Sequence, residues 1–150
     1  DTAFMTWLLE CRFYSFRCVS RDDLKVIIAE SGANDPNFNL RREAGFMLRA
    51  RTSGGISYAS VIEPHGEYNP TVEYTLGSHS QVKSVSHYEN GADELILIKT
   101  KDGQTVGLGI GDDVDPSATH TISVDGRDMT WTGPYHLFHS EAHTRPKQDE

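Results

Sequence analysis

Apolar and polar residues alternate with a period of two along most of the chain, which is the pattern of β-strands that bury one face. The segments between the alternating runs are short and rich in Gly, Pro, Asn and Asp, and none is a convincing helix. The sequence therefore predicts an all-β fold, an antiparallel β-sandwich of jelly-roll-like type with no substantial helical domain. The predicted strands are Leu24–Ala29, Arg42–Arg51, Ile56–Glu63, Val72–Leu76, Gln81–Glu89, Ala92–Lys101, Gln104–Ile110, Thr119–Val124 and Arg127–Thr132.

Three dipeptides in the second half of the chain predict tight hairpins between consecutive strands. They are Asn90-Gly91, Asp102-Gly103 and Asp125-Gly126. Each pair is a preferred centre of a two-residue type I′ turn, which needs positive φ at both positions. The second half is therefore expected to be a meander of antiparallel strands.

Two of the predicted strands have a composition that indicates their surroundings. Leu95–Ile98 is apolar at every position, so this strand is expected to be central in a sheet, with both faces covered. In Val106–Gly111 apolar residues alternate with glycine, so one face packs and the other is bare backbone. Bare backbone marks the close approach of another segment or of a ligand, and we expect a neighbouring loop to lie on the glycines.

The two ends of the chain carry weaker patterns. Asp1–Ser20 alternates slightly in favour of β structure and has no signal-peptide pattern. His139–Glu150 has no apolar periodicity and is expected to be a flexible tail. The odd spacing of Cys11 and Cys18 predicts no disulfide between them. The whole chain of 150 residues fits a single domain.

Two polar segments interrupt the strands and are the candidate binding loops. Gly32–Glu43 gathers asparagine and arginine around Pro36, and His65–Pro70 is bracketed by prolines, with Pro64 expected to end the strand before it. Asparagine amides donate and accept hydrogen bonds, and arginine grips a carboxylate with two, so the first loop suits a hydroxyl-rich, acidic ligand. The alternative is a structural turn that satisfies only its own backbone. The predicted ligand-binding residues are Asn34, Asn37, Asn39, Arg41 and Arg42.

The charge balance excludes some partners. The chain has 22 acidic and 14 basic residues and a net charge of −8, which argues against a nucleic-acid partner. No apolar run is long enough to span a membrane. A polyanion would have to be held by a local positive cluster, for which Arg41, Arg42, Arg49 and Arg51 are the candidates, with Arg12, Arg17, Arg21 and Lys25 near them.

Two long motifs and one short motif resemble a known family. Gly32–Glu43 reads Gly-Ala-Asn-Asp-Pro-Asn-Phe-Asn-Leu-Arg-Arg-Glu, Ala59–Asn69 reads Ala-Ser-Val-Ile-Glu-Pro-His-Gly-Glu-Tyr-Asn, and Trp131–Tyr135 reads Trp-Thr-Gly-Pro-Tyr. From about Leu24 to Phe138 the chain is similar to the C-terminal region of the oligoalginate lyases, polysaccharide lyase family seventeen, relatives of the heparinase II/III group. The resemblance implies the terminal β-domain of a secreted or periplasmic enzyme.

The resemblance also implies an acidic, alginate-like polysaccharide or oligosaccharide as partner, together with a helical catalytic domain that this chain lacks. The catalytic groups of the family lie mainly upstream of anything present here. On the chemistry of β-elimination alone, an amide or guanidinium must neutralise the sugar carboxylate, and a Tyr or His must move protons. Tyr68 and His65 are the candidate catalytic residues, provided that the two polar loops meet. The alternatives are a non-catalytic carbohydrate-binding module and a structural domain that docks the missing catalytic domain.

Neither a cofactor nor a metal site is predicted. His136, His139 and His143 would share one helical face and could hold zinc, but they fall in or near the expected tail. Asp112, Asp113 and Asp115 form an acidic turn without the pattern of a calcium loop, and a solvated turn is the preferred interpretation.

Overall fold

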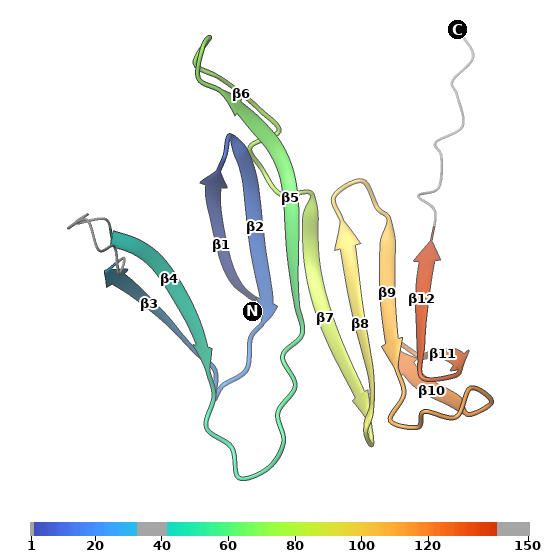
Figure 1. Cartoon of the computed structure of the whole chain (residues 1–150). Coiled ribbons are helices and arrows are strands. Elements are labelled where there is room, and N and C mark those ends of the chain that lie inside the picture. Colours follow the sequence, from blue (N-terminus) through green and yellow to red (C-terminus); the bar gives the residue numbers. More distant parts are fainter. Residues whose placement is uncertain (1, 33–41, 141–150) are drawn as a thin grey trace, which may run out of the picture. The chain divides into compact units, whose positions relative to one another are not determined.

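The structure, a computed structural model, describes residues 2–32 and 42–140 (Figure 1). These residues form β-strands and turns without a helix, and all strand pairs are antiparallel, so the all-β prediction is confirmed. Within the same residues there is accordingly no helix that could cross a membrane. The chain divides into two compact units, of which Ser20–Tyr58 is one and the segments on either side of it form the other.

The first unit is a hairpin of β3 (Lys25–Gly32) and β4 (Arg42–Arg49). Both strands were predicted, and their alternation leaves Val26 and Ile28 exposed. The connection between them contains Asn34, Asn37, Asn39 and Arg41, which lie outside the described residues. Arg42 is the first residue of β4, and its backbone pairs with Gly32, but its side chain is likewise outside the description.

The second unit begins with a four-stranded sheet in the order β1-β2-β5-β6. Its strands are β1 (Thr2–Leu9), β2 (Arg12–Val19), β5 (Ser60–Asn69) and β6 (Tyr74–Leu76). The N-terminal segment is thus β as predicted, folded into a hairpin. The turn falls at Glu10 and Cys11, both in the left-handed region with φ of 48° and 65°. No Gly, Asn or Pro marks this turn, so no residue preference predicted it.

The prediction that Pro64 ends a strand is wrong, and so is the polar loop His65–Pro70 that depended on it. β5 runs through Pro64 to Asn69. Proline is tolerated where its missing N–H has no ladder partner. The pairing of β5 with β6 covers only Glu67–Asn69, so Pro64 lies on a part of β5 that pairs with β2.

The strand predicted at Val72–Leu76 is shorter than expected and does not face inward. β6 has three residues, and Tyr74 and Leu76 are exposed, as is Val72 before it. Because β6 is the edge strand of its sheet and pairs with only a short piece of β5, its side chains gain little cover.

A second four-stranded sheet has the order β12-β9-β8-β7, visible in Figure 1 as four ribbons side by side. Its strands are β7 (Val82–Asn90), β8 (Asp93–Thr100), β9 (Thr105–Ile110) and β12 (Tyr135–Ser140). β8 is an inner strand, as its continuous apolar run predicted. β12 includes His139 and Ser140, so the prediction that the tail starts at His139 is wrong, and the rest of the expected tail lies outside the described residues.

The Asp125-Gly126 hairpin between β10 (Thr119–Val124) and β11 (Arg127–Thr132) is confirmed in detail. Val124 pairs with Arg127, and the two turn residues have φ of 51° and 78°. Positive φ at both central positions is the type I′ geometry that this dipeptide favours.

The other two hairpins connect the predicted strands through different turns. Asn90 pairs with Asp93, so the first loop is Gly91-Ala92, and only Gly91 has positive φ, as in a type II′ turn. In the second, the Thr100 N–H donates to the Gln104 carbonyl at 3.0 Å. This leaves a three-residue loop that ends at Gly103, with φ of 91°.

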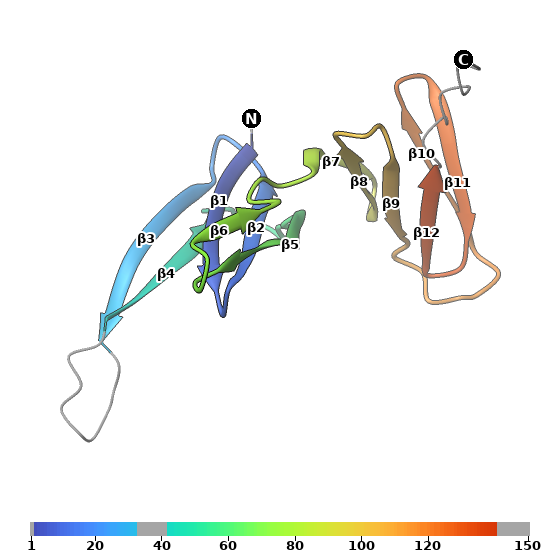
Figure 2. The ribbon, with the colours of Figure 1, turned by 90° about the horizontal axis from the view of Figure 1, so that it is seen from above.

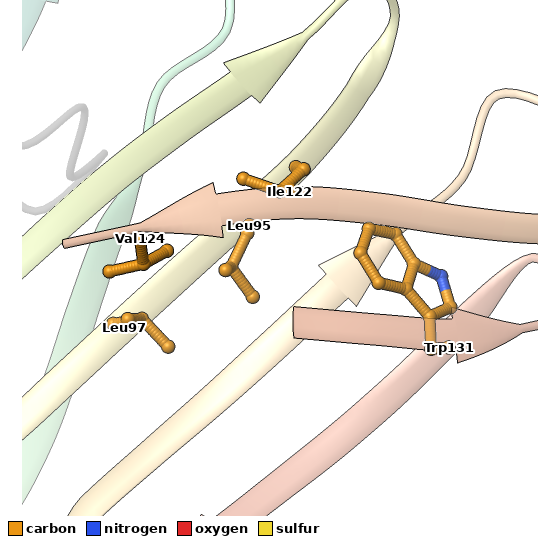
Figure 3. Packing of buried hydrophobic residues seen from close by; sticks show 5 residues of the cluster. All are labelled: Leu95, Leu97, Ile122, Val124 and Trp131. Carbon is orange, nitrogen blue, oxygen red and sulfur yellow. The ribbon is translucent and has the colours of Figure 1, made fainter. Parts of the chain in front are cut away.

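The core lies between the second sheet and the β10–β11 hairpin, which forms a separate layer beside it (Figure 2). Figure 3 shows Ile122 and Val124 of β10 above Leu95 and Leu97 of β8, with Trp131 of β11 alongside. All five side chains are buried. Each buried large apolar side chain contributes about 1.5–3 kcal/mol to the free energy of unfolding, so this cluster holds the two layers together.

The glycine face of β9 is the packed face, which corrects the sequence interpretation. A Cβ added to Gly109 would lie 3.0 Å from the indole of Trp131, and one added to Gly111 would lie 2.4 Å from the ring of His120. The predicted close approach of another segment is therefore real, but the segment is the β10–β11 hairpin and not a loop. Val106 and Leu108 on the other face are only half-buried.

Candidate functional site

His65 is fixed in the β1-β2-β5-β6 sheet by hydrogen bonds at both ring nitrogens. Its ring stacks on Phe13 with centroids 6.1 Å apart. The Nε2 atom lies 2.8 Å from the Ser15 hydroxyl, and the Nδ1 atom lies 2.9 Å from the carbonyl oxygen of Gly77. A carbonyl can only accept, so Nδ1 carries a proton and donates to Gly77. In the neutral ring, Nε2 then accepts from Ser15.

The hydroxyl that contacts His65 is buried, because Ser15 has 1% of its surface exposed. Its oxygen lies 2.8 Å from the hydroxyl of Thr6 on β1. When Ser15 donates to His65, Thr6 donates to Ser15, and the network is complete from β1 to the start of the β6–β7 connection. The pairing of a serine with an oriented histidine has the form of a nucleophile and its base, but a substrate cannot reach a buried hydroxyl. The network is structural.

A bulge at Gly66 sets the direction of the next side chains. Phe13 pairs with His65 and Arg12 with Glu67, so Gly66 is the extra residue. Its φ is 53°, and an added Cβ would lie 2.1 Å from the carbonyl oxygen of Gly77. Because of the bulge, Tyr68 has the same face of β5 as His65, about 7 Å further along the strand.

The two predicted catalytic residues, His65 and Tyr68, therefore lie on the same face of the sheet. The charged and amide side chains nearest to Tyr68 lie on the other face. Arg12 and Glu67 are cross-strand partners, and Asn69 follows Glu67 at a spacing of two. By the alternation of strands, these three residues lie on the opposite face from Tyr68. The sheet thus separates the guanidinium and amide of this region from the phenol and imidazole.

Glu63 joins the same sheet to the start of β7. Its carboxylate accepts hydrogen bonds from the Ser80 hydroxyl, from the Gln81 N–H at 2.8 Å and from the Val82 N–H at 3.5 Å. Burial opposes ionisation of this carboxyl, but these hydrogen bonds outweigh it and lower the pKa of Glu63 below its ordinary value. The carboxylate is a structural acceptor and stays ionised at neutral pH.

A cleft of about 330 Å³ lies between the β1–β2 turn and the end of β5. The Tyr68 N–H donates to the carbonyl oxygen of Cys11 at 2.8 Å and links the end of β5 to the β1–β2 turn. The Asn69 side-chain oxygen accepts from the Thr71 N–H at 3.0 Å, which leaves its amide nitrogen for a ligand. The place of Arg12 in this cleft depends on the pairing of β2 with β5, so no local pattern predicts it. The cleft is lined by Glu10, Cys11, Arg12, Glu67, Tyr68, Asn69 and Pro70.

A larger cleft, about 660 Å³, lies along β7 and β10 but has the wrong charge for an acidic sugar. Its lining carries the carboxylates of Glu89 and Asp128 and includes neither Lys nor Arg. His87, which also lines the cleft, lies between Glu89 at 3.6 Å and Glu94 at 3.2 Å. A second carboxylate would be repelled there. The lining residues are His87, Tyr88, Glu89, Asn90, Thr121, Ile122, Ser123 and Asp128.

One group of side chains has the spacing of a metal site but is explained by the fold. Ligand atoms of Asp93, Asp112 and His120 lie within 4.8 Å of one another. The Nδ1 atom of His120 donates to Asp93 at 2.8 Å, while its ring lies against Gly111 and stacks on Trp131 at 5.3 Å. Asp93 also accepts from the Asp112 N–H at 3.2 Å. The group ties β8, β10 and the turn after β9 together.

The metal sites considered from the sequence have little support in the described residues. His136 and His139 lie on one strand at an odd spacing and therefore point to opposite faces. His143 lies outside the description. Asp115 accepts hydrogen bonds from the backbone and the hydroxyl of Ser117, which lower the pKa of its carboxyl, as expected for a turn carboxylate.

Cys11 and Cys18 are both free, as predicted, and burial raises the pKa of the Cys18 thiol.

Comparison with known proteins gives a consistent relationship. Residues 100–138, which include β9, β10 and β11, match the family described as "Exo-oligoalginate lyase-like, C-terminal domain". The chain is 37% identical over 131 residues to a protein of Stenotrophomonas maltophilia named "Alginate lyase", across 87% of this chain. It is 36% identical over 131 residues to a protein of Saccharophagus degradans named "Exo-oligoalginate lyase", across 85% of this chain. The chain spans 18% of the length of each relative.

Proposed function

We propose that this chain, which carries an exo-oligoalginate lyase-like C-terminal domain, is the β-domain of a protein that degrades alginate by β-elimination. In this role the chain binds the uronate polymer and does not complete the catalytic site by itself. A polymer has to be met outside the cytoplasm, so we also propose a secreted or periplasmic location, which cell fractionation would test.

One observation favours a binding role over autonomous catalysis. Both ring nitrogens of His65 are hydrogen-bonded to groups of the protein, the Ser15 hydroxyl and the Gly77 carbonyl oxygen. A general base must reach the proton that it removes, and this ring has no free nitrogen for that purpose. Tyr68 stays a candidate proton donor and lines one cleft with Arg12 and Asn69, but by strand alternation its side chain points to the opposite face from theirs. β-elimination needs these groups around one sugar, so a site on this sheet alone lacks its parts.

The experiment is a calorimetric titration of the chain with oligoalginate and, as control, with an uncharged glucan oligosaccharide of equal length. We expect saturable binding of oligoalginate that weakens as salt rises, because the attraction of carboxylates is screened. The predicted loop contacts Asn34, Asn37, Asn39, Arg41 and Arg42 belong to this proposal. Replacing Arg41 and Arg42 by Ala should weaken binding, more at low salt than at high salt. Equal binding of the glucan would overturn the proposal.

A second candidate function has an observation of its own. The β1-β2-β5-β6 sheet exposes large apolar side chains on both faces, Phe4 and Leu8 on the face of His65 and Ile62 and Leu76 on the face of Arg12. Exposed apolar surface of this kind marks interaction sites when it is contiguous. A structural domain that docks another part of a longer protein would use such a surface and would bind neither saccharide in the titration.

A further inference from the structure

We infer that the cleft at the β1–β2 turn is a uronate subsite, in which Arg12 binds the sugar carboxylate while Asn69 and Glu67 bind its hydroxyls. The inference rests on the proposed function and names the place where the polymer is held. It is carried by the cleft, by the chemistry of its lining and by the backbone of the turn that forms its rim.

The lining offers complementary groups on one face of the sheet. Arg12, Glu67 and Asn69 are all exposed, and their positions in register bring them to the same end of β2 and β5. Among the described residues no ion pair or side-chain hydrogen bond occupies the Arg12 guanidinium, so its donors are free for a carboxylate. A guanidinium binds a carboxylate through two parallel hydrogen bonds. The Asn69 nitrogen donates and the Glu67 carboxylate accepts, which suits sugar hydroxyls.

The rim of the cleft is a strained turn. Glu10 and Cys11 both have positive φ, and neither is a residue that adopts this conformation easily. Asn-Gly would form the same hairpin turn without that cost. Residues held in such conformations cluster at ligand sites. Both turn residues, Glu10 and Cys11, line the cleft together with Arg12.

Size and charge define the ligand further. A volume of about 330 Å³ is at the small end for ligand pockets, which fits one uronate residue of a chain. The lining has two carboxylates, Glu10 and Glu67, and one guanidinium. A uronate carboxylate is therefore accepted only at Arg12, and the two glutamates oppose other negative charge in the cleft. Removing the negative charge of Glu10 or Glu67 should therefore strengthen uronate binding.

The experiment measures the affinity of the whole chain for oligoalginate by calorimetry, with three substitutions. Arg12→Ala should weaken binding about tenfold, because a charge-assisted hydrogen-bonded pair is lost. Glu67→Gln should strengthen it. Arg127→Ala, an exposed arginine on β11 that removes the same charge, is the matched control and should change affinity by less than about twofold. Thermal melting of each variant checks that it is folded. If Arg12→Ala does not fold, Arg12→Lys takes its place in the comparison.

The outcomes separate this inference from the proposed function. The subsite is overturned if Arg12→Ala and Arg127→Ala lower the affinity for oligoalginate equally, or if neither lowers it. The proposed binding role then still stands, provided that the unaltered chain binds oligoalginate. Weaker binding in Glu67→Gln also contradicts the assigned charge balance. Failure of the unaltered chain to bind oligoalginate overturns the proposed function and the subsite together.

Discussion

The Nε2 atom of His65 lies 2.8 Å from the Oγ atom of Ser15, a residue fifty positions earlier in the chain whose side chain is buried. This pair decides between two interpretations of the region around Tyr68. An exposed histidine beside a tyrosine would favour acid–base chemistry, whereas a histidine held by a buried serine and a backbone carbonyl is part of the scaffold. The geometry favours the scaffold.

Removal of the His65 side chain is predicted to destabilise the fold. His65→Ala would leave the Ser15 hydroxyl without its acceptor, and an unsatisfied buried polar group costs about 1–3 kcal/mol. Urea denaturation should therefore give a lower free energy of unfolding than for the unaltered chain. The exposed His79 provides a control, since His79→Ala removes the same side chain from the surface. Equal stability of the two variants would show that the hydrogen bonds of His65 contribute nothing.

Gly66 is predicted to be irreplaceable at the bulge. In Gly66→Ala the new Cβ would meet the Gly77 carbonyl oxygen at 2.1 Å, at a backbone φ of 53°. Strain and steric overlap together should cost about 2 kcal/mol or more, measured by urea denaturation. Gly54→Ala is the matched change, because an added Cβ there has no neighbour within 4 Å. A Gly66→Ala variant as stable as Gly54→Ala would contradict the described bulge.

Glu63 gives the fold a dependence on pH. Its pKa in the folded state is lowered below the ordinary value of about 4.3, so the carboxylate contributes stability above that pH and loses it as the pH falls through the folded pKa. Glu63→Gln should lower the free energy of unfolding by about 1 kcal/mol at neutral pH. The difference from the unaltered chain should shrink below about pH 4. Denaturation curves across this range test it, with the exposed Glu73→Gln as control. A difference that grows on acidification would reverse the assigned sign.

Local patterns in the sequence were sufficient for most strands and for one turn. Asp125-Gly126 adopts the predicted type I′ turn because both residues tolerate positive φ, and β8 is central because it is apolar on both faces. The Glu10–Cys11 turn escaped prediction because its residues have no preference for that conformation. The prediction that Pro64 ends a strand failed because proline interrupts a strand only where its missing N–H would have been paired. No local sequence pattern shows whether that position is paired.

The candidate site depends on contacts between residues that are distant in the chain. Ser15 meets His65, and Arg12 meets Glu67, only through the register of β2 with β5. That register contains a bulge, and a shift of one residue exchanges the faces of every side chain beyond it. The sequence could therefore supply Tyr68 and His65 as candidates, but not the partners that hold His65 or the face on which Tyr68 lies.

The most direct test of the account is to incubate the chain with oligoalginate and follow the ultraviolet absorbance of the unsaturated uronate that β-elimination produces. The account predicts no rise in absorbance, even at chain concentrations comparable to that of the oligosaccharide, under conditions in which calorimetry detects binding. A rise that disappears in Tyr68→Phe would contradict it and would establish that this β-domain carries a complete catalytic site.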